Sequence, residues 1–68
     1  PEQKKVLVQS QLNWIKFRDS EFQLINSIYS QLQGTMYIPM SVYRKVNIVK
    51  NRSEELHQYL AILKFKEP

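Results

Sequence analysis

Apolar residues recur with a helical period between Lys4 and Leu32, and they occupy an unusually wide arc. At about 100° per residue they cover about 200° of a helix, and polar residues hold the remaining wedge. A surface helix usually needs an apolar stripe only a little wider than about 100°. We therefore predict a helix over about residues 3–33 that is contacted from two sides. Its apolar positions are Val6, Leu7, Val8, Trp14, Ile15, Phe17, Phe22, Leu24, Ile25, Ile28, Tyr29 and Leu32.

A second apolar series, spaced by threes and fours, predicts another helix over about residues 39–63. Gly34 can turn left-handed and end the first helix, and Pro39 suits the first turn of the next. A connection this short makes the two helices antiparallel neighbours. The predicted fold class is all-α, a long antiparallel helical hairpin. The stripe of the second helix consists of Val42, Val46, Val49, Leu56, Leu60 and Leu63, with Ile48, Tyr59 and Ile62 on a thinner margin.

The two helices are not matched in the width of their apolar surfaces. One stripe of about 100° can cover only one side of the wider arc, and soluble monomers avoid large exposed apolar patches. We expect a second copy of the chain, as in a homodimer, or another protein helix from upstream in the parent protein to complete a bundle. The margin expected to bind this partner consists of Leu7, Trp14, Phe17, Leu24 and Ile28.

With 68 residues, the chain is expected to form a single helical domain over residues 1–68. The start at Pro1 rather than Met suggests a processed chain or an excised fragment. There is no cysteine, and no apolar run approaches the roughly 18 residues of a membrane span.

One charged residue falls inside the wide apolar arc. Arg18 is surrounded there by apolar positions, so its guanidinium must be paired or must extend to solvent. Glu21, three residues on, is within its reach, and Ser53 interrupts the second stripe with Arg52 and Glu55 at its edges. We predict a partly buried polar cluster of Arg18 and Glu21 with Ser53, Arg52 or Glu55. We interpret it as fixing the register of the helices rather than as a ligand site.

Enzymatic chemistry finds little support, and we expect no catalytic residue, cofactor or metal. Glu54 and His57 form a Glu-x-x-His pair, but both point away from the apolar stripe and no second copy of the motif exists. Neither a glycine-rich phosphate loop nor a nucleophile motif is present. The net charge of +4 and pI of about 9.6 would favour nucleic acid as a partner. The basic residues are scattered, however, so a solvated surface is the better interpretation.

The run from Leu12 to Phe22, LNWIKFRDSEF, resembles the signature of the LprI-like lysozyme-inhibitor domain family. The shared features are a Trp, then an aromatic-Arg-Asp triplet, then a Glu. Later landmarks of the family also appear, in order and without a gap between about Leu7 and Leu63. They are Tyr29, the Gly34-Thr35 pair, and Arg52 followed four residues later by Leu56.

The resemblance implies a small, helical, non-enzymatic binding domain, possible inhibition of lysozyme-type hydrolases, and a periplasmic or secreted location in the bacterial envelope. Two features of the family are missing. Its cysteine pair falls on Phe22 and near Arg44, and its usual upstream helix is absent. Common lysozymes are basic, so a chain of charge +4 would meet them with like charge. A structural homo-oligomerisation module and a nucleic-acid-binding helical module are the alternative functions.

Overall fold

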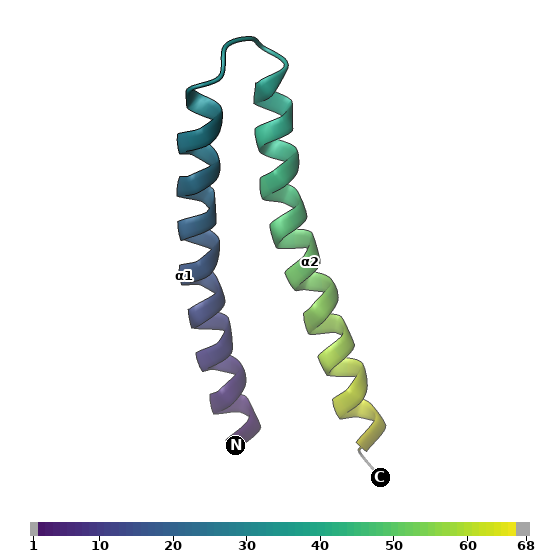
Figure 1. The fold of residues 1–68 in the computed structure, drawn as a ribbon. Helices are drawn as coiled ribbons and strands as arrows, with labels where there is room; N and C mark the ends of the chain where they lie inside the picture. Colours follow the sequence, from purple (N-terminus) through teal and green to yellow (C-terminus); the bar gives the residue numbers. More distant parts are fainter. Residues whose placement is uncertain (1, 67–68) are drawn as a thin grey trace.

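The computed structural model describes residues 2–66, which form two long helices joined by a short loop. Helix α1 spans Glu2–Ser30 and helix α2 spans Tyr37–Lys66. They run antiparallel, as predicted, and no strand is present within the described residues. Figure 1 shows that the helices lie side by side near the loop and diverge towards the chain ends. The predicted all-α helical hairpin is therefore confirmed.

The loop differs in detail from the prediction. Helix α1 ends at Ser30, and its last carbonyls accept two tighter bonds, from Gln31 N–H to Ile28 O (3.3 Å) and from Leu32 N–H to Tyr29 O (3.2 Å). Gly34 lies beyond this turn with φ of +118°, a conformation that costs a side-chain-bearing residue free energy. The glycine therefore reverses the chain inside the loop rather than directly at the helix end.

Helix α2 begins earlier and ends later than its sequence pattern suggested. It starts at Tyr37, whose N–H donates to Gly34 O (3.4 Å), so Pro39 is the third helical residue. A proline is tolerated there because N–H groups in the first turn have no partner inside the helix. The rings of Tyr29 and Tyr37 meet at 6.4 Å across the loop and connect the adjoining helix ends.

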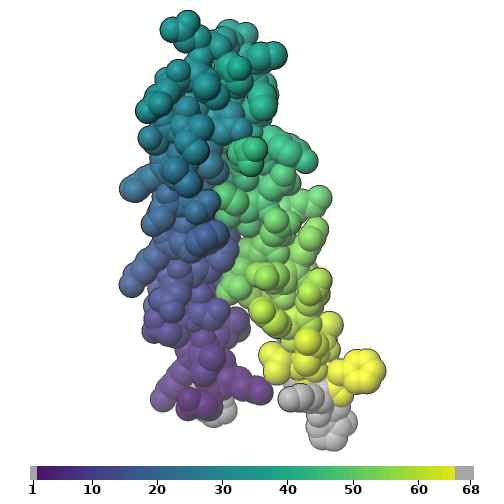
Figure 2. All heavy atoms as spheres, in the orientation of Figure 1, coloured from purple at the N-terminus to yellow at the C-terminus, as the bar shows by residue number. Residues whose placement is uncertain are grey.

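The hairpin is elongated and has very little interior. Its Cα atoms extend 56 × 19 × 8 Å, and the radius of gyration is 16.3 Å. A compact chain of this length would have a radius of gyration of about 11 Å. Within residues 2–65, Ile25 (6% exposed) and Arg52 (8%) are the buried residues. In Figure 2 the two helices touch along most of their length and separate at their free ends.

The face of α2 that packs on α1 is not the predicted stripe. Val42, Val46, Val49 and Leu60 stay about half exposed, and of the stripe Leu56 is the best covered. The stripe prediction was wrong because the seam holds polar and charged side chains that pack through their stems and hydrogen bonds. The residues of α2 along the seam are Ser41, Lys45, Ile48, Arg52 and Leu56.

Candidate functional site

Arg52 is the centre of the contact between the helices. Its Nε donates to Gln11 Oε1 (3.1 Å) and one terminal nitrogen donates to Ser10 Oγ (3.2 Å), both on α1. The other terminal nitrogen approaches Glu55 Oε1 at 3.4 Å, one turn further along α2. The planar guanidinium therefore uses its fork of donors to connect two positions of α1 at once.

Aromatic rings and cations alternate along the seam. The Arg52 guanidinium lies 5.9 Å from the centre of the Trp14 ring, and Arg18 lies 5.6 Å from the same ring. Arg18 also lies 6.0 Å from the Phe22 ring, which Lys45 approaches at 5.6 Å from α2. Each contact of this kind contributes about 0.5–1 kcal/mol when partly exposed. Together they allow three cations to sit between the helices.

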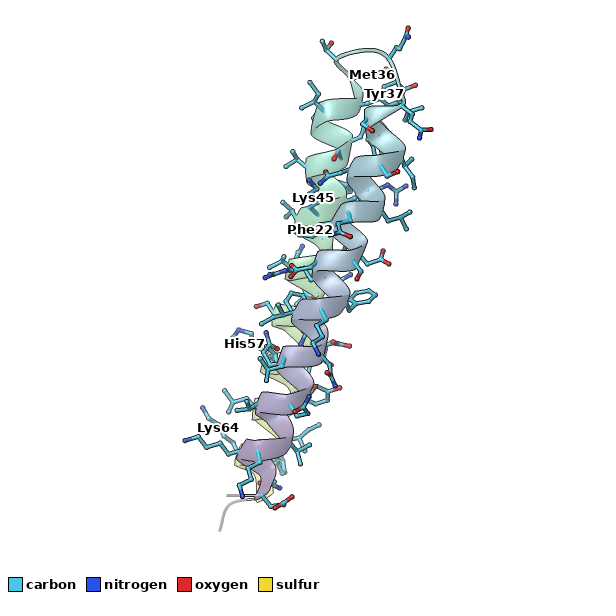
Figure 3. The ribbon with its side chains drawn as sticks, turned by 90° about the vertical axis from the view of Figure 1, so that its left-hand side faces the viewer. Phe22, Met36, Tyr37, Lys45, His57 and Lys64 are labelled. Carbon is cyan, nitrogen blue, oxygen red and sulfur yellow. The ribbon has the colours of Figure 1, made fainter. Side chains whose placement is uncertain are left out.

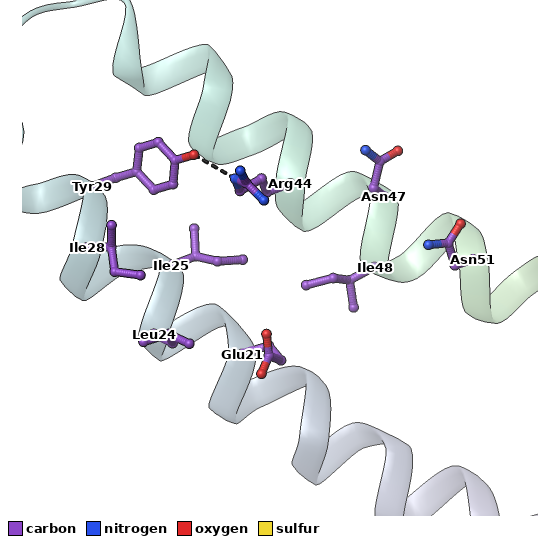
Figure 4. Close-up of a pocket in the computed structure, with 9 residues that line it drawn as sticks. All are labelled: Glu21, Leu24, Ile25, Ile28, Tyr29, Arg44, Asn47, Ile48 and Asn51. Carbon is purple, nitrogen blue, oxygen red and sulfur yellow. Dashed lines mark hydrogen bonds between the residues drawn. The ribbon is translucent and has the colours of Figure 1, made fainter.

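Two further hydrogen bonds join the helices nearer the loop. Lys45 Nζ donates to Asn26 Oδ1 (2.6 Å), and Arg44 Nε donates to the Tyr29 hydroxyl (2.6 Å). Figure 4 shows the second bond beside a shallow pocket of about 490 Å³ between the helices. The polar cross-links thus run from Arg52 towards the loop, where the helices lie closest.

The structure brings only part of the predicted polar cluster together. Arg52 and Ser53 line one hollow of about 310 Å³ beside Trp14, and Arg52 also pairs with Glu55. Glu21 lies apart from them, in the pocket of Figure 4. Arg18 donates to Asp19 at 2.9 and 3.1 Å rather than to Glu21. The guanidinium leans over Phe22, on the side where Asp19 lies, and Glu21 lies on the other side of α1. The expected pairing of Arg18 with Glu21 is therefore corrected.

Sequence reasoning missed the acceptors Ser10 and Gln11. Gln11 precedes Arg18 by seven residues and so shares its side of α1, which was the available signal. A polar residue at such a position needs a partner from the facing helix, and Arg52 provides it.

The predicted partner-binding margin lies mostly along one broad face of the hairpin. Phe17, Leu24 and Ile28 are about half exposed there, and Leu7 is similarly exposed near the free ends. Trp14 differs, because it is half-buried under the two arginines. Across the groove, α2 presents polar residues to the same face. We call this surface the mixed face and define it by Phe17, Leu24, Ile28, Arg44, Asn47 and Asn51.

Neither a group of metal ligands nor a membrane-spanning helix is found among the described residues. Within residues 2–66, no three histidine or acidic side chains come together as a metal site requires. Neither helix in this range combines the length and the apolar character needed to cross a bilayer. His57, shown in Figure 3, lines the hollow beside Trp14 instead.

A family model described as "Lysozyme inhibitor LprI" matches residues 1–56, which include the Trp14–Phe22 run and Arg52. The chain belongs to the LprI family. This description is of an inhibitor rather than of an enzyme. Searches of curated proteins and of solved structures found no match.

Proposed function

We propose that this LprI domain is a non-enzymatic binding protein that inhibits a lysozyme-type hydrolase in the bacterial envelope, after export to the periplasm or the exterior. The observation that carries the proposal is the family match over residues 1–56. The fold agrees with a binding role. Polar side chains such as Arg44 and Arg52 hold the two helices together, and the large apolar side chains on the broad faces are exposed to a partner.

The mixed face is the surface that we assign to this partner. It combines exposed apolar side chains of α1, such as Phe17 and Leu24, with the polar side chains of α2 around Arg44. Non-obligate protein–protein interfaces have this composition. They are about as apolar as the rest of the protein surface, and they carry polar groups at the rim. Arg44 is held in place by Tyr29, which reduces the entropy lost when a partner binds it.

Hydrolysis of bacterial cell walls by a lysozyme tests the function directly. We expect the chain, added between about 1 and 100 μM, to lower the hydrolysis rate in a dose-dependent way, as an interface of modest size would allow. No inhibition at the highest concentration would refute the proposal.

A charge-matched pair of variants then tests which surface binds the hydrolase. Leu24→Lys should raise the half-inhibitory concentration about tenfold or more, whereas its neighbour Gln23→Lys, on the polar side of α1, should not change it. Equal inhibition by both variants would reject the mixed face as the binding surface.

A further inference from the structure

The two broad faces of the hairpin differ in composition. Opposite the mixed face, both helices contribute large apolar side chains, and we call this surface the apolar face. Pockets bring its members together across the helices, Phe22 with Val46 and Val49 in one, and Val8 with Leu60 in another. In the edge-on view of Figure 3, Phe22 and Lys45 lie next to each other along one edge. The apolar face is defined by Val8, Leu12, Phe22, Val46, Val49 and Leu60.

The direction of these side chains distinguishes between two kinds of bundle. We measure directions around each helix axis, from the direction of the other helix of the hairpin. A third helix seated in the groove then lies at about 60°, whereas the helices of a second hairpin stacked on the first lie at about 90°. The reference residues are the most buried ones, Ile25 on α1 and Arg52 on α2. From them, the six positions of the apolar face lie about 60–140° around their helices, and their average is about 90°. The pattern fits a layer of two further helices.

The outermost positions support the same choice. Leu12 and Val46 lie about 120–140° from the buried reference residues, which is beyond the reach of one helix centred over the groove. Both are about half exposed in the hairpin. A partner as wide as the hairpin itself would cover them, and a second copy of this chain has that width.

The area of the face matches what a stable dimer needs. A surface 56 Å long and 19 Å wide has an area of about 1,000 Å², and a standard interface buries about 800 Å² on each partner. The hairpin also lacks an interior of its own, with Ile25 the buried apolar residue within residues 2–65. Two-helix hairpins rarely fold alone in water, because their burial does not offset the conformational entropy of the chain.

Few charges accompany the face. The six residues that define it are uncharged, and the lysines that line its pockets, Lys45 and Lys50 beside Phe22 and Lys4 beside Val8, have long stems that let the ammonium group extend to solvent. A surface that is apolar on both contributing helices is typical of obligate homodimers. We propose that the apolar face binds the same face of a second copy of this chain, which makes a dimeric four-helix bundle. This inference goes beyond the proposed function, because the mixed faces remain on the outside of the dimer.

Sedimentation of the unmodified chain and cross-linking of single-cysteine variants test this arrangement. Because the chain has no cysteine, each variant carries one thiol. We expect a folded dimer at about 100 μM, in the micromolar range or tighter that a standard interface supports. With a short bis-maleimide linker, Val49→Cys on the apolar face should give covalent dimers in high yield. Leu24→Cys on the mixed face should remain largely uncrosslinked. A folded monomer at this concentration, or preferential cross-linking through Leu24→Cys, would overturn the proposal.

A second pair of variants keeps the proposal testable if one of them folds poorly. Val49→Lys should raise the dissociation constant of the dimer at least about 30-fold, because the change occurs once in each copy of a symmetric interface. Leu24→Lys should leave it within about threefold. Equal effects of the two variants would place the dimer contact elsewhere. Leu24→Lys is expected to weaken inhibition but not dimerisation. Failure of the proposed function would therefore appear in the inhibition assay, and failure of this inference in the dissociation constant of the dimer.

Discussion

At the residue scale, two arginines that share one tryptophan have different surroundings. Arg52 is 8% exposed and donates to two acceptors on the facing helix, whereas Arg18 donates only to the exposed carboxylate of Asp19 beside it. Both lie within 6 Å of the Trp14 ring, so the cation–π contacts do not distinguish them. The difference lies in the hydrogen bonds that Arg52 makes across the seam, and we propose that these bonds set the register of the two helices.

This comparison predicts unequal costs for the same conservative change. Arg52→Lys keeps the charge but cannot donate to Ser10 and Gln11 at once, so we expect it to lower the free energy of unfolding by about 1–2 kcal/mol. Arg18→Lys should cost less than about 0.5 kcal/mol, because its ion pair is exposed to water. Urea unfolding followed by circular dichroism at one protein concentration measures both. Similar costs for the two variants would contradict the register role of Arg52.

At the element scale, the loop depends on one glycine. Gly34 has φ of +118°, and a Cβ placed there would meet the Tyr37 ring at an ordinary distance of 3.8 Å. Steric overlap with neighbours is therefore absent at this position, and the cost of a side chain would come from the backbone conformation alone.

We predict that Gly34→Ala destabilises the protein by about 1–2 kcal/mol, which corresponds to a fall in melting temperature of about 5–10 °C for a domain of this size. Gln33→Ala, one residue earlier and exposed, should change the melting temperature by less than about 3 °C. Thermal unfolding at matched concentration measures the difference. A fall for Gly34→Ala no larger than that of the control would show that the loop relaxes without strain.

The elements themselves could be predicted from the sequence, but their contacts only in part. The helical period of the apolar residues and the positions of Gly34 and Pro39 were sufficient for two antiparallel helices, with bounds within about three residues. The pattern could not tell which neighbour an apolar side chain meets. The stripe through Val46 and Val49 was assigned to the seam, yet it points to the apolar face. Periodicity finds the most apolar direction of a helix, and in a bundle this direction is the common core rather than the nearest helix.

The candidate site was limited in the same way. Arg18 was identified because a charge inside an apolar arc is visible in the sequence, but its partner depends on which way the side chain leans. The bond from Arg52 to Ser10 joins residues 42 positions apart, and no local pattern contains that information. The resemblance to the LprI family rested on local motifs, and the family match confirmed it.

At the scale of the whole molecule, the sign of a salt effect tests the dimer. Two chains of net charge +4 repel each other, and the six side chains that define the proposed interface are uncharged, with lysines alone as the charged residues in its pockets. Salt screens the repulsion and leaves the apolar contact intact, so raising NaCl from 20 to 300 mM should tighten the dimer by about two- to fivefold. Sedimentation equilibrium at several protein concentrations measures this change. A dimer that weakens as salt rises would instead depend on ion pairs between the subunits. The apolar face offers no such pairs, so this result would place the contact among the charged residues at the edges of the hairpin.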